Sequence, residues 1–185
     1  AYTLENDMDS ELKALADRVV DLIGSAQEED GYLGTYFTIE EPERKFKRLS
    51  ESHELYCAGH FLEAAVAYFH ATGSKKVVEM ARKLADCIDR HFGREEGKIR
   101  GYDGHEEIEI GLMRLYHLTG EERYLNLSRF FLFERGTNGN FFERQKEEDP
   151  NKTPLIQGLE KFPLSYYQIH KPILEQDTAE GHAVR

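Results

Sequence analysis

The chain has 185 residues, of which 39% are hydrophobic and 32% charged, and a formal net charge of -11. This composition is typical of a folded globular protein and excludes a disordered or fibrous one. The acidic charge would repel a phosphate backbone, so we expect no nucleic-acid partner. No run of about 20 apolar residues is present, so we expect no membrane helix.

The two cysteines, Cys57 and Cys87, both fall within predicted helices. A disulfide framework is therefore not expected, and a reducing, cytoplasmic location is the default. The sequence starts at Ala1 without an initiator methionine and stops shortly after Asp177-Thr178, a typical helix start. We therefore expect these residues to be an internal piece of a longer protein, from which a signal peptide could have been lost.

Five helices are predicted from apolar residues that recur every three or four positions. Glycines and Thr-Gly pairs, which are typical of helix ends, follow several of them. The expected helices cover about residues 12–23, 52–71, 74–91, 105–118 and 121–134, and a further helix begins near Thr178.

A short internal repeat indicates how these helices are arranged. Residues 68–73 align with residues 115–120, 47 positions later, and each copy reads helix, Thr-Gly turn, helix. One such hairpin cannot bury both of its faces, so hairpins must stack in a solenoid or close into a toroid. The sequence therefore predicts an all-α fold built from antiparallel helix hairpins.

The stretch at approximately 137–174 has a different composition, with four of the five prolines and several aromatic residues. We expect a long loop region there. Long loops within a compact domain are often functional, because they can cover a pocket on a rigid scaffold.

The segment Ser52–His60 contains the densest group of reactive side chains. On a helix, His53, Cys57 and His60 would share one face and could form part of a zinc site. The HExxH zinc pattern, however, needs a histidine where Cys57 stands, and cysteine is commonly buried as a small hydrophobic residue. We therefore assign no metal ligand in this chain.

A second group, Gly101–Glu109, places His105 and three glutamates at a predicted helix start. Paired carboxylates carry out glycoside hydrolysis, but acidic residues at helix starts also complement the helix dipole. The spacing alone therefore assigns no catalytic carboxylate.

His53, His105 and His182 each stand near the first turn of alternate helices. In a toroid of hairpins these turns would meet at one end of the central cavity. Neutral imidazoles donate and accept hydrogen bonds, which suits a polyhydroxylated ligand. We predict that these three histidines bind a sugar.

Five motifs follow one another along the chain: DGYL from Asp30, HELYCAGH from His53, GYDGHEEIE from Gly101, IHKP from Ile169 and GHAVR from Gly181. Together they make nearly the whole chain similar to glycoside hydrolase family 127, the β-L-arabinofuranosidase family once filed as a domain of unknown function. The resemblance implies an (α/α)6 barrel, of which residues 1–185 would form about half, as one partial domain. It also implies that His53, His105 and His182 contact arabinofuranose.

The resemblance further implies retaining hydrolysis by a cysteine nucleophile in a zinc site of three cysteines and a glutamate, with a second glutamate as acid/base. Zinc keeps a thiol deprotonated, and a thiolate is a strong nucleophile. Neither Cys57 nor Cys87 lies in a matching motif, so we expect the nucleophile, the acid/base and the zinc ligands beyond Arg185. The chain alone would then be inactive, and its partners would be an arabinofuranoside or oligosaccharide and the rest of the same polypeptide. A homodimer stays open.

Two alternatives remain. Other α/α toroids are uronyl hydrolases, lyases or epimerases, and the fold alone does not choose among them. A non-catalytic helical-repeat binding module is the third hypothesis, although such concave surfaces typically present aromatic and arginine anchors rather than histidine and glutamate.

Overall fold

The computed structural model describes residues 1–137, 139–149, 151, 153–155, 157–158, 161–163 and 166–179. Every named element in these residues is a helix, which confirms the all-α prediction. The long helices are α2 (Ser10–Ala26), α5 (Glu54–Thr72), α6 (Lys75–His91), α7 (Ile108–Thr119) and α8 (Glu122–Glu134). The shorter elements are α1 (Tyr2–Asn6), α3 (Thr35–Ile39), η1 (Pro42–Arg44), α4 (Leu49–Ser52), α9 (Phe141–Glu148) and η4 (Ile173–Glu175).

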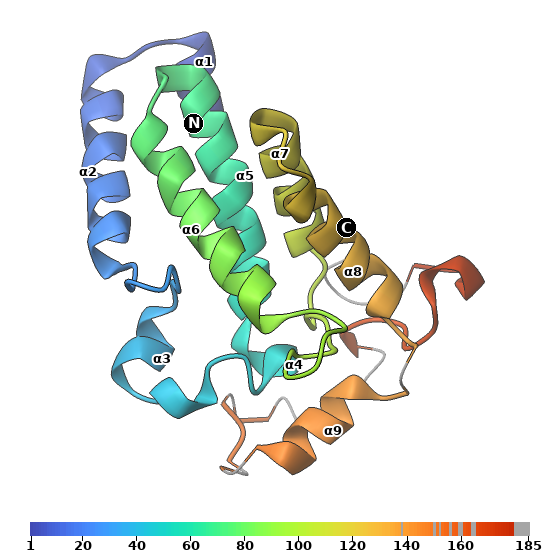
Figure 1. Ribbon diagram of the computed structural model, residues 1–185. Coiled ribbons are helices and arrows are strands. Elements are labelled where there is room, and N and C mark those ends of the chain that lie inside the picture. Colours follow the sequence, from blue (N-terminus) through green and yellow to red (C-terminus); the bar gives the residue numbers. More distant parts are fainter. Residues whose placement is uncertain are drawn as a thin grey trace.

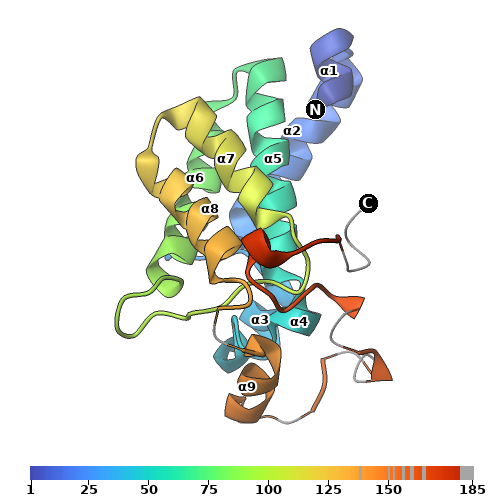
Figure 2. The same ribbon diagram turned by 90° about the vertical axis from the view of Figure 1, so that its right-hand side faces the viewer.

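The helices form stacked antiparallel hairpins (Figure 1). Helix α5 packs against α1, α6 and α7, helix α7 packs against α8, and α6 also contacts α2 and α8. One layer therefore contains α1, α5 and α7, and the other contains α2, α6 and α8. Helices α3, α4 and α9 lie together at one end of the hairpins (Figure 2).

The Thr-Gly repeat recurs in the structure with the same hydrogen bonds in both copies. Gly73 and Gly120 end α5 and α7 in the left-handed conformation, with φ of 74° and 72°. The threonine before each glycine donates its hydroxyl to a carbonyl four residues earlier, at 2.7 Å for Thr72 and 2.8 Å for Thr119. The same hydroxyl oxygen accepts from the N–H two residues later, at 3.3 Å in each copy. The hairpin turn is therefore a local property of this sequence.

Two glycines allow α5 and α7 to approach closely. A Cβ on Gly59 would lie 2.6 Å from the carbonyl carbon of Glu107, and one on Gly111 would lie 2.5 Å from the carbonyl oxygen of Gly59. Neither contact can be relieved by a side-chain rotation, because both involve backbone atoms. The absence of a side chain at these positions therefore sets the spacing of the two helices.

Helix α2 leaves much of its apolar face uncovered. No residue of α2 is buried, and Leu15, Val19 and Leu22 are 50%, 47% and 71% exposed. Ile110 on α7, in the layer of α5, is 52% exposed. Such exposed faces are those expected where further hairpins pack in a complete toroid.

The loop predicted at approximately 137–174 contains a helix, so that prediction is wrong at α9. The Asn140 side chain caps the helix by accepting from the Glu143 N–H at 3.3 Å. Phe142 is fully buried against Tyr102 and anchors the helix to the hairpins, with ring centroids 5.4 Å apart. The predicted helix near Thr178 has not begun at Ala179, and its remainder lies outside the described residues.

No helix in the described part of the chain is both long and apolar enough to cross a membrane.

Substituting Gly59→Ala should destabilise the protein by about 1–3 kcal/mol, because the added methyl group meets the Glu107 backbone. Urea unfolding would measure this loss. The control is Gly24→Ala in α2, whose added methyl would lie 3.2 Å from the sulfur atom of the unbranched Met80 side chain. That substitution should be neutral or stabilising, since alanine favours a helix over glycine. Equal unfolding free energies for both variants would contradict the role given to Gly59.

Candidate sugar-binding site

The structure brings His53 and His105 together. Their rings are stacked, with centroids 4.2 Å apart and an interplanar angle of 26°. The predicted meeting of histidines at one end of the hairpins is therefore observed for these two. His182 lies outside the described residues.

Neither histidine lies within a helix. His53 is the N-cap residue of α5, with φ 55° and ψ 20°, and α7 begins at Ile108, three residues after His105. The prediction of a helix from about His105 is thus wrong at its start. The cause is local: the Asp103 carboxylate accepts from the His105 N–H at 3.2 Å, which holds these residues in a turn.

Hydrogen bonding fixes the orientation of the His53 ring. Its Nδ1 is 2.9 Å from the carbonyl oxygen of Glu51. Because a carbonyl only accepts, Nδ1 is the donor, and in the neutral ring Nε2 remains as an acceptor. The Tyr56 ring lies beside both imidazoles, with centroids 6.0 Å from His53 and 5.5 Å from His105. The group thus combines hydrogen-bonding nitrogens with an aromatic surface.

Asp103 connects the segments that carry this group. Its carboxylate accepts from the Tyr56 N–H at 2.8 Å, and its backbone carbonyl accepts from the Gln168 side chain. The residue is buried, and burial raises the pKa of the carboxyl well above its usual value. A single side chain therefore joins the start of α5 to the His105 loop.

Two glycines of the 101–109 motif allow this loop to pack against its neighbours. Gly104 donates its N–H to the Leu49 carbonyl at 3.2 Å, and a Cβ there would lie 2.9 Å from the Ser50 Cα. A Cβ on Gly101 would overlap the Phe141 ring. The loop is thus held between α4 and α9.

A buried cluster of charges fixes the far side of α4. Arg44 donates to the Asp149 carboxylate at 2.9 Å and to the Thr153 carbonyl at 2.8 Å. Arg48 forms an ion pair with Glu51 and lies 3.4 Å from Asp149. Asp149 is fully buried, and Glu51 is also the residue whose carbonyl holds His53. The charge cluster therefore ties residues after α9 to the segment that carries His53.

The motif glutamates have ion-pair partners in the structure. Glu109 is bound by Arg135 at 3.0 Å, and Glu107 lies 3.3 Å from His60 Nδ1. Burial raises the pKa of both carboxyls. Glu54 accepts the Tyr32 hydroxyl at 2.6 Å and the Phe46 N–H. These three glutamates each join neighbouring segments of the described residues.

Cys57 is an exposed residue with mainly apolar neighbours. It lines a groove between α2, α5 and α6 with side chains that include Leu22, Leu33 and Phe61, and desolvation raises the pKa of its thiol. The zinc set of His53, Cys57 and His60 is not formed. The one His/carboxylate group within metal-ligating distance in the described residues is His60, Glu63 and Glu107, which contains no cysteine. The residues present therefore do not fit a thiolate zinc site.

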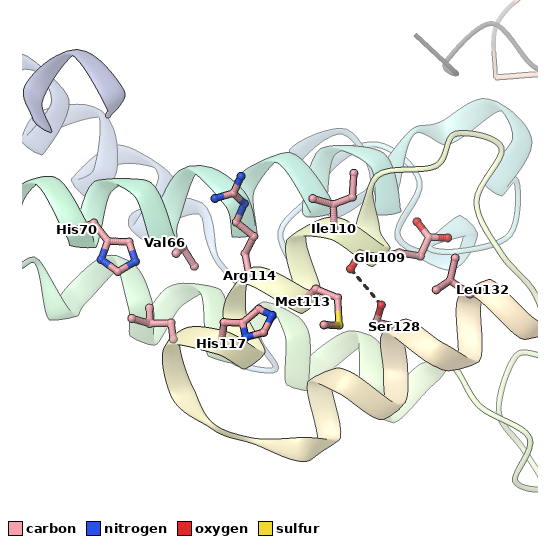
Figure 3. A pocket seen from close by; sticks show the side chains of 10 residues that line it. Val66, His70, Glu109, Ile110, Met113, Arg114, His117, Ser128 and Leu132 are labelled. Atoms are coloured by element: carbon pink, nitrogen blue, oxygen red, sulfur yellow. Dashed lines mark hydrogen bonds between the residues drawn. The ribbon is translucent and has the colours of Figure 1, made fainter. Parts of the chain in front are cut away.

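A separate apolar groove lies away from these histidines. It has a volume of about 730 Å³ and runs along α7 between α5 and α8 (Figure 3). Val66, Ile110, Met113 and Leu132 supply apolar walls, and Ser128 donates to the Glu109 carbonyl at 3.1 Å. It does not include His53 or His105. Its apolar lining is typical of a packing surface, so the stacked histidines remain the candidate site.

The whole chain, residues 1–185, matches the family model described as β-L-arabinofuranosidase, GH127 catalytic domain. The chain belongs to glycoside hydrolase family 127. This confirms the family suggested by the sequence motifs.

Relatives in family 127 agree in sequence and in fold. A non-reducing end β-L-arabinofuranosidase of Bifidobacterium longum is 46% identical over the whole chain, which spans 29% of that protein. A crystal structure of a GH127 β-L-arabinofuranosidase from Geobacillus stearothermophilus T6 is 49% identical, with a TM-score of 0.89, over 100% of this chain and 28% of that one. A GH127 β-arabinofuranosidase structure is 34% identical, with a TM-score of 0.80, over 99% of this chain and 27% of that one. The chain therefore spans less than a third of the length of these relatives.

Substituting Asp149→Ala should destabilise the protein by about 3–5 kcal/mol, because Arg44 and Arg48 would stay buried without its charge. Urea unfolding measures the loss, and limited proteolysis after residue 149 should become faster. The control is Asp21→Ala, which breaks an exposed pair with Lys76 and should change stability little. A similar, small effect of both variants would show that the charge cluster does not hold this segment.

Cys57→Ala should leave kcat/KM of the full-length protein within about threefold of wild type, because the thiol lies in an apolar groove and its raised pKa disfavours the thiolate. Steady-state hydrolysis of an aryl glycoside gives the comparison. Loss of turnover at unchanged thermal stability would instead make Cys57 a nucleophile.

Proposed function

We propose that the full-length protein is a retaining β-L-arabinofuranosidase and that His53 and His105 bind the arabinofuranose ring. One observation carries the proposal: in a member of family 127, two motif histidines from separate segments have their rings stacked 4.2 Å apart. Relatives at 46% and 49% identity are named as β-L-arabinofuranosidases.

The chemistry of the group suits a furanose. His53 Nε2 can accept a hydrogen bond from a sugar hydroxyl, since Nδ1 already donates to the Glu51 carbonyl. The partly buried Tyr56 ring offers an apolar face against which sugar C–H groups can pack. The residues of this chain therefore bind and orient the sugar.

The groups that break the glycosidic bond belong, in this proposal, to the part of the protein outside this chain. The involvement of Glu54, Glu107 and Glu109 in internal contacts and the apolar setting of Cys57 support this division. Zinc, held by residues outside this chain, would keep the nucleophilic thiol deprotonated there. His182, in the GHAVR motif, is proposed as a third sugar contact.

The remaining features of the proposal concern the assembly. Further hairpins of the same polypeptide would cover the exposed faces of α2 and α7 and complete an (α/α)6 barrel around the site. Both cysteines are free thiols, which supports a reducing compartment such as the cytoplasm.

The test uses the full-length protein and p-nitrophenyl β-L-arabinofuranoside. His53→Ala and His105→Ala should each lower kcat/KM by about 5- to 150-fold, the range for losing one buried hydrogen-bond partner. The controls are His70→Ala and His117→Ala, which lie within α5 and α7, the helices that follow His53 and His105, and line the groove of Figure 3. These controls should keep wild-type kcat/KM.

Different failures have different meanings. Wild-type turnover by His53→Ala and His105→Ala would refute the sugar site and keep the enzyme. No turnover by the folded, zinc-loaded protein would refute the activity and favour the other α/α-toroid reactions. Absence of any glycan binding or turnover would favour a helical-repeat binding module.

A further inference from the structure

We propose that Asp103 is a positioning residue for sugar binding: its buried carboxylate locks the start of α5 to the His105 loop and thereby sets the relation between the His53 and His105 rings. This inference rests on the proposed function of the two histidines. It concerns how that site is built, and it assigns a role to a side chain that would not itself touch the sugar.

The start of α5 needs a hydrogen-bond acceptor from elsewhere. The first N–H groups of a helix have no partner within the helix, and an N-cap side chain usually supplies one. His53 occupies the N-cap position, but its side chain makes no capping hydrogen bond and instead bonds the Glu51 carbonyl. Asp103, 47 residues later, accepts from the Tyr56 N–H at 2.8 Å. Asp103 therefore supplies the capping acceptor of α5, and the His53 ring bonds the Glu51 carbonyl instead.

The second oxygen of the same carboxylate acts on the other histidine. Oδ2 accepts from Tyr56, whereas Oδ1 accepts from the His105 N–H at 3.2 Å and lies 4.0 Å from His105 Nδ1. Each oxygen thus accepts a hydrogen bond from one of the two segments, Oδ2 from the start of α5 and Oδ1 from the His105 loop. The rings are stacked at 4.2 Å, so a small displacement of either segment would separate them.

An asparagine could not accept hydrogen bonds from both segments at this position as Asp103 does. In Asp103→Asn one oxygen becomes an NH2 group, which would face the N–H of Tyr56 or of His105, donor against donor. The variant keeps the volume of the side chain and removes its charge. The variant should therefore change the stacking of the His53 and His105 rings without leaving a cavity.

The experiment is a double-mutant cycle in the full-length enzyme, with kcat and KM measured on p-nitrophenyl β-L-arabinofuranoside and thermal unfolding as a second readout. Asp103→Asn alone should lower kcat/KM about tenfold, mainly by raising KM. In the His105→Ala background the same change should lower kcat/KM less than about twofold, because the relation between the two rings, which Asp103 sets, no longer exists.

The matched control is Glu134→Gln, which neutralises a carboxylate of similar burial, paired with Arg94 and Arg100 at the end of α8. It should lower the melting temperature without raising KM. A rise in KM by Glu134→Gln that matches Asp103→Asn, or a full tenfold effect of Asp103→Asn in the His105→Ala background, would overturn the proposal. Wild-type turnover by His105→Ala would instead refute the sugar site on which it rests.

If Asp103→Asn yields no folded enzyme, Gly104→Ala takes its place in the cycle. The added methyl group would lie 2.9 Å from the Ser50 Cα and push the His105 loop away from α4. The Asp103 side chain itself is unchanged in this variant. The same loss of effect in the His105→Ala background supports the proposal. Unchanged kcat/KM in a folded Gly104→Ala enzyme overturns it.

Discussion

The Asp103 carboxylate, which lies in a loop, caps the start of helix α5, and the arrangement of His53 and His105 depends on this cap. Helix α5 begins directly after His53, which has a φ of 55° and whose own side chain makes no capping hydrogen bond. Asp103 supplies the missing acceptor from a loop far along the chain. Burying the carboxyl raises its pKa and costs free energy, which two N–H donors and the positive end of the helix offset. The loop, the helix start and the two imidazoles are fixed by the same set of bonds.

Close backbone packing at three glycines also fixes the relative positions of these segments. Gly59 and Gly111 allow α5 and α7 to touch backbone to backbone, and Gly104 does the same for the His105 loop and α4. Within HELYCAGH, the motif that contains Gly59, the residues therefore have different tasks: His53 faces its partner ring and Glu54 binds the Tyr32 hydroxyl. Gly59 and Glu54 thus fix the position of the helix start that carries His53.

The sequence predicted the features that arise from local chemistry. Periodicity located α2, α5, α6, α7 and α8, and the Thr-Gly repeat predicted turns whose hydrogen bonds recur in both copies. It failed at the start of α7: the neighbouring Asp103 holds His105 in a turn, and Gly104 packs that turn against α4, a contact that the periodicity of apolar residues does not reveal. Helix α9 was missed although Asn140 followed by Glu143 is a capping signal, because the nearby prolines were read as loop over the whole stretch. The pairing of His53 with His105 was predicted from the helix order, but Asp103 and Tyr56 were not, since their roles exist only once the two segments meet.

The buried charge cluster beside α4 fixes the position of the segment that packs on it. Burying Arg44, Arg48, Asp149 and Glu51 removes four charges from water, and well-packed apolar side chains in such places are often equally stabilising. The charges differ from apolar packing in one respect: an unpaired member is costly, so only one register of the segment after α9 satisfies all of them. Apolar residues would tolerate a slip of the segment along α4. Because Glu51 belongs to the cluster and also holds the His53 ring through its carbonyl, a fixed register there keeps that ring in place. The cluster thus contributes geometry to the site more than free energy to the fold.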